Sequence, residues 1–288
     1  MRIAVTGASG FVGRHVVEVL AARKDVGEVV VASRRATESS PWSSSIRAVR
    51  LDVQEPGAEQ FDALGRPDVL IHLAWTGLPD YKSLGHFEVQ LGAHYRFLSG
   101  LVRAGLQSLL CAGTCLEYGL QAGELHEGLP TGPTTAYGLA KDGLRRQLEL
   151  LRDVSPFALT WGRLFYLYGD GQPASSLYPA LMAAIDRGDR AFRMSRGDQL
   201  RDYLPVGEAA RLLVALALDA AGAGVVNVCS GRPVSVRSLV EQWIRARHAS
   251  IELDLGHYPI PDYEPLAFWG ATAKLADTLS RRESGKSR

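Results

Sequence analysis

The chain has 288 residues, of which 46% are hydrophobic, and its 32 Lys and Arg against 31 Asp and Glu leave a formal net charge of +1. This length allows a large core, as one domain or as a domain with a smaller lobe, and the balanced charge argues against nucleic acid or an anionic membrane surface as a partner. Cys111, Cys115 and Cys229 are too few for a disulfide framework or a zinc site, so we predict free thiols and no metal.

The chain begins with a predicted strand, residues 2–5, that leads directly into T-G-A-S-G-F-V-G, residues 6–13, and then into a helix. In this context Gly7 would allow a tight turn, Gly10 would let backbone N–H groups approach a pyrophosphate, and Gly13 would let the helix pack near the strand. The spacing is G-x-x-G-x-x-G, and a plain tight turn is the alternative. We assign the cofactor to Gly7, Ser9, Gly10, Phe11, Val12 and Gly13.

Because a strand is predicted at this position, we expect no signal peptide, and no apolar run reaches the length of a membrane span. We therefore expect a soluble cytoplasmic protein.

The second predicted strand, 28–33, ends in Ser33-Arg34-Arg35, where an acidic residue would bind the ribose 2′-hydroxyl of NAD. An arginine there accommodates the 2′-phosphate of NADP instead, so the cofactor prediction is NADP, with NAD as the alternative. A solvated loop end is the other explanation for the two arginines. Residues 37–45 are predicted to form a mobile surface loop, and Asp52 and Val53, after a third strand at 46–51, are predicted to contact the adenine.

Further strands at 68–73 and 109–112, separated by a long helix at 85–104, continue the alternation of strand and helix. This alternation predicts an α/β fold with a doubly wound parallel sheet of the Rossmann type. Ligands of such sheets lie beyond the carboxyl ends of the strands. We therefore expect the residues that follow the fourth and fifth strands to face the nicotinamide: Leu73, Ala74, Trp75 and Ala112.

Tyr137 and Lys141 lie four residues apart on a predicted helix that ends near Leu151, so they share a face. A lysine ammonium beside a phenol favours the phenolate and lowers the pKa of the tyrosine, which suits an acid or base near neutral pH. Thr114 supplies a hydroxyl after the fifth strand. Such a pair also occurs by chance, but the preceding dinucleotide turn favours a catalytic role.

Together these segments resemble the extended short-chain dehydrogenases/reductases, in the nucleotide-sugar epimerase/dehydratase/ketoreductase group. The resemblance runs from residue 1 to about 279. It rests on residues 6–13, H-L-A at 72–74, residues 114–119, Y-G-L-A-K at 137–141, G-R-L-F-Y-L-Y-G at 162–169 and R-D-Y at 201–203.

The resemblance implies roles for single residues. Tyr137 would be the acid/base, Lys141 would bind the ribose, and Thr114 would hydrogen-bond the reacting sugar oxygen. Arg201 would bind the diphosphate of a nucleotide sugar, with structural pairing to Asp202 as the alternative. The resemblance also assigns Leu164 to the cofactor, and it leaves Glu127 without a role.

Several positions depart from the family pattern. Cys115-Leu116 stands where the 4,6-dehydratases carry Asp-Glu, which argues against dehydration. Glu117, one position later, should point elsewhere on strand alternation; a structural carboxylate is the plain explanation for it, and its role stays open. Tyr166 replaces a common Asn, which puts diphosphate recognition there in doubt. Trp75 stands where relatives have Ala and would wall the sugar pocket, with Cys115 beside it.

The last third combines predicted helices at 177–187, 208–220 and 236–247 with strands near 191–202, 225–229 and 251–255. The resemblance implies a smaller C-terminal lobe that holds the substrate, to which Arg232, Tyr258 and Trp269 are assigned with packing as an equal alternative. We expect a cofactor domain over 1–170, a partly interleaved substrate lobe over 171–280, and a disordered tail over 281–288.

The function expected from the resemblance is reduction of the C4 ketone of a nucleotide-diphosphate 4-keto-6-deoxy sugar by NADPH. The alternatives are an NAD-dependent nucleotide-sugar 4-epimerase and a non-catalytic NADP-sensing protein. The resemblance also implies a homodimer formed through the helices at 85–104 and after Tyr137. Leu91, Tyr95, Leu98, Leu144 and Leu148 are candidates for its interface, and core packing explains them equally well.

Overall fold

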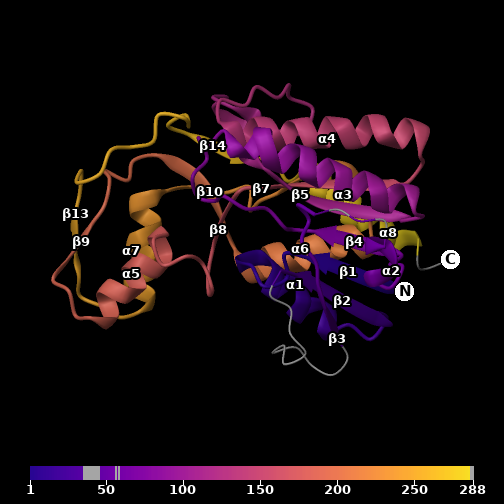
Figure 1. Ribbon diagram of the computed structural model, residues 1–288. Helices are drawn as coiled ribbons and strands as arrows, with labels where there is room; N and C mark the ends of the chain where they lie inside the picture. Colours follow the sequence, from indigo (N-terminus) through magenta and orange to yellow (C-terminus); the bar gives the residue numbers. More distant parts are fainter. Residues whose placement is uncertain (35–45, 56, 58, 286–288) are drawn as a thin grey trace.

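The computed structural model describes residues 1–34, 46–55, 57 and 59–285. Within these residues, the chain forms a seven-stranded parallel sheet with helices on both faces and a smaller lobe at one side (Figure 1). The strand order is β11-β7-β5-β4-β1-β2-β3. The strands are β1 (Arg2–Thr6), β2 (Glu28–Ser33), β3 (Ile46–Arg50), β4 (Val69–His72), β5 (Ser108–Thr114), β7 (Ala158–Leu164) and β11 (Gly224–Val228). The predicted doubly wound sheet is therefore confirmed.

Two apolar layers cover the sheet, because its strands are buried on both faces. Along β1, Ile3 and Val5 point into one layer and Ala4 into the other, as strand alternation requires. The first layer contains α1 (Phe11–Ala21), α6 (Val206–Leu218) and α8 (Ala273–Gly285). The second contains α2 (Gln60–Ala63), α3 (Leu91–Arg103) and α4 (Ala136–Val154), and Figure 1 shows α3 and α4 lying side by side.

The smaller lobe has a core of its own, built around Trp243. Its elements are α5 (Leu177–Asp186), α7 (Val236–Ala246) and the parallel pair β9 (Ala191–Arg193) and β13 (Glu252–Asp254). Two small sheets connect it to the main domain: β12 (Pro233–Ser235) with β10 (Leu200–Pro205) and β8 (Tyr166–Tyr168), and β14 (Phe268–Gly270) with β6 (Gly123–Leu125). The chain crosses between lobe and sheet, since α6, β11 and α8 return to the main domain.

Some boundaries differ from those predicted. Strand β5 extends to Thr114, and the long helix begins with a π-helical turn, His86–Gln90, before α3. Strand β7 was not predicted, and only its last three residues belong to the motif at 162–169. Helix α8 continues to Gly285, into the segment for which a disordered tail is predicted, and α8 packs against α6 and β11. Residues 286–288 lie outside the described range.

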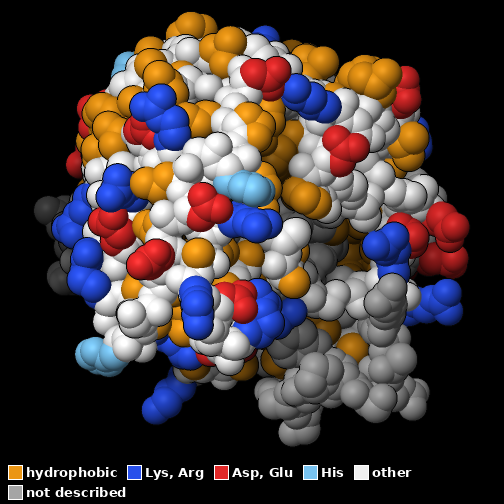
Figure 2. All heavy atoms as spheres, turned by 90° about the vertical axis from the view of Figure 1, so that its left-hand side faces the viewer, with side chains coloured by type: hydrophobic (Ala, Val, Ile, Leu, Met, Phe, Trp, Pro, Cys, Tyr) orange, Lys and Arg blue, Asp and Glu red, His pale blue; other side chains and the backbone are white. Residues whose placement is uncertain are grey.

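The expected dimer-interface leucines Leu98, Leu144 and Leu148 are fully buried between α3, α4 and the sheet, so they form the core. On the face in Figure 2, basic and acidic side chains are interspersed among hydrophobic ones. Over the described residues, no helix is long and apolar enough to span a membrane.

Candidate active site

Two adjoining cavities lie where the strand order reverses, between β1 and β4. This switch point is where open parallel sheets bind ligands. One cavity, of about 220 Å³, extends toward the ends of β2 and β3, and the other, of about 410 Å³, extends toward β5, α4 and the lobe. We call them the adenosine-side cavity and the catalytic cavity. Four residues line both: Gly7, Gly10, Leu73 and Trp75.

The glycine turn packs too closely for side chains at two of its positions. Gly7 has a φ of +73°, and a Cβ there would lie 2.6 Å from the Ala74 nitrogen. A Cβ on Gly13 would lie 2.1 Å from the Gly7 oxygen, so this glycine lets α1 start against the turn. The N-terminus of α1 consequently faces the space shared by the cavities, where its free N–H groups suit a pyrophosphate.

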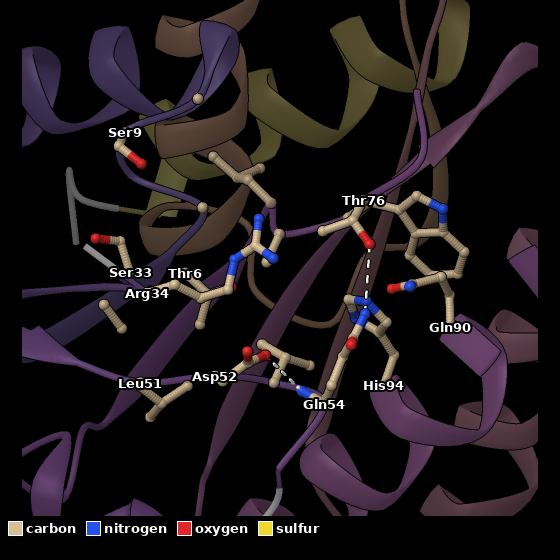
Figure 3. Close-up of a pocket in the computed structure, with 17 residues that line it drawn as sticks. Thr6, Ser9, Ser33, Arg34, Leu51, Asp52, Gln54, Thr76, Gln90 and His94 are labelled. Carbon is tan, nitrogen blue, oxygen red and sulfur yellow. Dashed lines mark hydrogen bonds between the residues drawn. The ribbon is translucent and has the colours of Figure 1, made fainter. Parts of the chain in front are cut away.

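Polar groups from β2, β3 and the loop after β4 surround the adenosine-side cavity. Figure 3 shows Arg34 reaching into it from the end of β2. Asp52 accepts a hydrogen bond from the Gln54 backbone N–H at 2.9 Å, and the Gln54 amide donates to Thr76 at 3.4 Å. Ser33 and Val53 also line the cavity as predicted, whereas Arg35 lies outside the described residues.

Gln90 supplies an orphaned group on the same wall. Its Oε1 is buried without a hydrogen-bond partner, and the side chain lines the adenosine-side cavity (Figure 3). A buried acceptor without a partner costs free energy unless a ligand or water satisfies it. The cavity therefore fits a dinucleotide on three grounds: the close glycine turn, the arginine at the end of β2, and an unpaired acceptor aimed inward.

The predicted catalytic residues Thr114, Tyr137 and Lys141 all line the catalytic cavity. Thr114 ends β5 and caps a short turn, since its Oγ1 accepts from the Leu116 N–H at 3.3 Å. That bond leaves its hydroxyl hydrogen free to donate. Tyr137 lies in the first turn of α4, and its backbone N–H donates to the Tyr81 carbonyl at 3.0 Å, which ties the loop after β4 to this helix.

The Lys141 ammonium is buried one helical turn after Tyr137. Its Nζ donates to the Ala112 carbonyl at 2.9 Å and lies 4.0 Å from the centre of the Trp75 ring. Burial lowers the pKa of Lys141 to about 8, and the neighbouring Cys111 and Glu117 act in the opposite direction. The lysine is therefore poised to change charge in a range that is accessible to experiment.

The prediction that Lys141 lowers the pKa of Tyr137 is not met in this structure. Burial raises the pKa of Tyr137 well above its ordinary value, and a hydrogen bond with Thr114 only partly opposes this. The Lys141 Nζ lies 5.8 Å from the centre of the Tyr137 ring, because the lysine points at Ala112 and Trp75 instead. Tyr137 is consequently a neutral phenol here, the form that donates a proton.

The contacts of Glu117 are those of a structural carboxylate, and they come from a turn rather than from strand alternation. It lies in the short turn Cys115–Tyr118 after β5, fully buried. One oxygen accepts from the Thr114 N–H and from the Trp161 indole, both at 2.9 Å, and the other accepts from Arg163 at 2.7 Å. It thereby fixes the backbone that carries Thr114.

Only some of the residues that were predicted to bind the substrate line the catalytic cavity. Trp75, Cys115 and Tyr166 line the catalytic cavity, as does Leu164 from the cofactor set. Arg201 and Trp269 are not among the cavity-lining residues. Arg201 is 2% exposed and pairs with Glu264, not with Asp202, whose carboxylate accepts backbone N–H groups of Ser230 and Gly231.

Glu264, and not the predicted Arg201, is the charged residue of this pair that lines the catalytic cavity. Its carboxylate accepts from Arg201 at 2.9 Å and from the Tyr166 hydroxyl, and it lines the catalytic cavity. Four residues that line the cavities were not predicted from the sequence: Glu264, Gln90, His94 and Tyr81. Only the position of Gln90 and His94, on the helix after β4, offered a signal, since this helix starts at the carboxyl edge of the sheet.

Comparisons with known proteins agree with this geometry. The family described as NAD dependent epimerase/dehydratase matches residues 3–229, and the chain belongs to this family. It is 29% identical over 274 residues to dTDP-6-deoxy-L-talose 4-dehydrogenase (NAD(+)) of Aggregatibacter actinomycetemcomitans, covering 94% of this chain and 100% of the relative. It is 28% identical to dTDP-6-deoxy-L-talose 4-dehydrogenase (NAD(P)(+)) of Kitasatospora kifunensis, covering 91% and 83%.

Among solved structures, the chain resembles MoeE5 in complex with UDP-glucuronic acid and NAD. The TM-score is 0.80 and the identity 26%, with 97% of this chain and 93% of the other covered. The predicted family and the predicted fold are thus confirmed.

Proposed function

We propose that this member of the family is an NADPH-dependent reductase of the C4 ketone of a nucleotide-diphosphate 4-keto-6-deoxy sugar. The observation that carries the choice of cofactor is Arg34, which enters the adenosine-side cavity from the end of β2 (Figure 3). No carboxylate stands at that strand end within the described residues, and a guanidinium suits the 2′-phosphate of NADPH. A cofactor of this kind is consumed in a net reduction.

The choice of reaction rests on the relatives and on the cavity. Two relatives are named as 4-dehydrogenases of a dTDP-6-deoxy sugar, and reduction of a 4-ketone is the reverse of that reaction. Cys115 and Leu116 line the cavity after Thr114, and neither side chain removes a proton for dehydration.

A bound nicotinamide cofactor would supply the hydride to the ketone carbon. Tyr137, a neutral phenol in this structure, donates its proton to the oxygen that becomes the alcohol. Thr114 donates a hydrogen bond to the same oxygen with the hydroxyl hydrogen that its capping role leaves free. Lys141, which donates to the Ala112 carbonyl in this structure, would bind the ribose hydroxyls of the cofactor.

The experiment follows NADPH absorbance, and separately NADH absorbance, with purified protein and a dTDP- or UDP-linked 4-keto-6-deoxyhexose. Stoichiometric oxidation of NADPH, faster than that of NADH, supports the reductase. No net oxidation, with NAD retained through purification and interconversion of nucleotide hexoses, would instead support a 4-epimerase. That alternative is favoured by the NAD found in the similar complex.

A homodimer in the cytoplasm is a further part of the proposal and rests on the resemblance. Because three of the leucines expected at the dimer interface are buried in the core, we propose the outward face of α4 as the interface instead. Leu139, Leu150 and Val154 are exposed there by 50%, 69% and 79%. Sedimentation of the wild-type protein and of Leu150→Lys tests it, since the substitution should yield monomers.

A further inference from the structure

Trp75 occupies the junction of the two cavities, because it follows β4 and lines both of them. The Lys141 ammonium lies over its indole face, 4.0 Å from the ring centre. A cation at this distance from an indole is attracted by the negative face of the ring, most strongly where water is excluded. Lys141 is 3% exposed, so the contact is largely desolvated.

A hydrogen bond holds the indole in place. The Trp75 Nε1–H donates to His86 Nδ1 at 3.1 Å, and His86 Nε2 lies 2.8 Å from the Asp80 carbonyl oxygen. Because a carbonyl only accepts, Nε2 carries the hydrogen and Nδ1 is left as the acceptor that the indole needs. His86 is 1% exposed, so the indole has little freedom to turn.

A second histidine stacks on the indole, and a third is hydrogen-bonded to that second one. His94 stacks on Trp75 with ring centres 4.4 Å apart, and it hydrogen-bonds His72 at 2.7 Å. His72 in turn lies 2.8 Å from the Thr6 hydroxyl. Burial lowers the pKa of His94 to about 3 and holds the pKa of His72 well below its ordinary value. Both imidazole rings are neutral, so the cation in contact with this indole is Lys141.

We propose that Trp75 is a positioning residue for Lys141, and that its anchored indole holds the lysine as an ammonium between the ring and the Ala112 carbonyl. Without the indole, burial alone would favour the neutral amine. The inference rests on the proposed function in that Lys141 serves a bound cofactor. It adds an aromatic side chain to the groups that hold the lysine.

Other titratable groups face Lys141 from every element around it. Those from the sheet and its edge are His72, Cys111 and Glu117, and those from the helices are His94 and Tyr137. Burial raises the pKa of Cys111 to about 12, so the thiol does not titrate near neutral pH. Lys141 is therefore the group around this indole that changes charge near pH 8.

The test measures the affinity for NADPH, without sugar, from pH 6.5 to 9.5 by cofactor fluorescence, in wild type, Trp75→Phe and Trp75→Leu. Trp75→Leu should weaken binding about tenfold near pH 8 and move the alkaline loss of affinity down by about one pH unit. Trp75→Phe keeps an aromatic face and should stay within about threefold of wild type. Trp243→Phe, in the core of the lobe, is the matched control and should leave the profile unchanged.

A double-mutant cycle with Lys141→Met separates positioning from structure. Trp75→Leu should lower the affinity for NADPH about tenfold when Lys141 is present, and it should leave that affinity unchanged in the Lys141→Met background. An equal loss in both backgrounds, or an unshifted pH profile, would overturn the inference. If Trp75→Leu does not fold, His86→Phe replaces it, since it removes the acceptor of the indole N–H and should shift the profile in the same direction. Wild-type protein that binds neither NADPH nor NADH would overturn the proposed function as well.

Discussion

Glu264 holds Arg201 by a buried ion pair, with the Arg201 Nε and Nη2 at 3.2 and 2.9 Å from one carboxylate oxygen. The guanidinium also donates from Nη1 to the carbonyls of Leu200 and Leu266, and its face lies 4.6 Å from the Phe268 ring. Most of the hydrogen-bond donors of Arg201 are thus already occupied. The charged group that the lobe presents to the catalytic cavity is the carboxylate of Glu264. A phosphate that enters there meets Glu264 before it meets the arginine.

Glu264→Gln should therefore tighten the binding of free UDP or dTDP. The change removes a like charge facing the cavity, while the amide oxygen still accepts from Arg201. We expect an increase of about tenfold, the factor that corresponds to about 1.4 kcal/mol, measured by calorimetry. Glu252→Gln, on an exposed strand of the lobe, is the control. Weaker binding in Glu264→Gln would instead mean that the carboxylate contacts the substrate directly.

The sheet and the cofactor side were predictable because their signals are local. A buried parallel strand is a continuous apolar run, and the glycine turn at residues 6–13 follows from the contacts that Gly7 and Gly13 must make. The substrate side was not predictable, because Arg201 and Glu264 are 63 residues apart and meet only through the packing of the lobe. Likewise, the sequence spacing of Tyr137 and Lys141 gave their shared helix face but could not show that Trp75 lies beside the lysine.

Arg34→Ala should weaken NADPH binding by about tenfold to a hundredfold, the range for losing a hydrogen bond to a charged group. Binding of NADH should be unchanged, because NADH has no 2′-phosphate for the guanidinium to contact. Fluorescence titration of both cofactors measures the two affinities. Arg47→Ala is the control, since Arg47 pairs with Glu28 at the exposed edge of the sheet. Equal losses for both cofactors would remove the argument for NADPH.

Tyr137→Phe should lower kcat by about a hundredfold to ten-thousandfold, the usual contribution of a general acid, with cofactor affinity retained. The ring contacts with Trp75 and Tyr81 remain, so the helix start should be intact. Tyr95→Phe on α3 serves as the control. Unchanged turnover in Tyr137→Phe would rule out the phenol as the proton donor, and it would return the non-catalytic sensor to consideration if cofactor binding persisted.

Glu117→Gln should destabilise the fold by about 3–5 kcal/mol, the range for leaving one charge of a buried pair without its partner. The partner is Arg163, 2% exposed, whose Nη1 already lacks a hydrogen bond. Urea unfolding measures the loss. The double variant Glu117→Gln/Arg163→Met removes both charges and should recover part of the stability. No recovery would show that the bonds of Glu117 to Thr114 and Trp161 matter more than the ion pair.

Lys141→Met should stabilise the protein near neutral pH while abolishing its function. The buried ammonium of Lys141 lowers the stability of the fold but is needed at the active site. The pKa of Lys141 falls from 10.5 to about 8 on folding, so between these values the unfolded chain binds more protons. Wild-type stability should thus rise with pH across that window, by about 3 kcal/mol for about 2.5 pH units. Below pH 8 the cost of the buried charge is present in full, and Lys141→Met should be the more stable protein by a similar amount. This advantage should shrink as the pH rises from 8 to 10.5.

Urea unfolding at a series of pH values tests the sign of this pH dependence, with Lys274→Met, an exposed residue of α8, as the control. A Lys141→Met protein that is less stable than wild type at every pH would show that the contacts of the ammonium with Ala112 and Trp75 outweigh its burial.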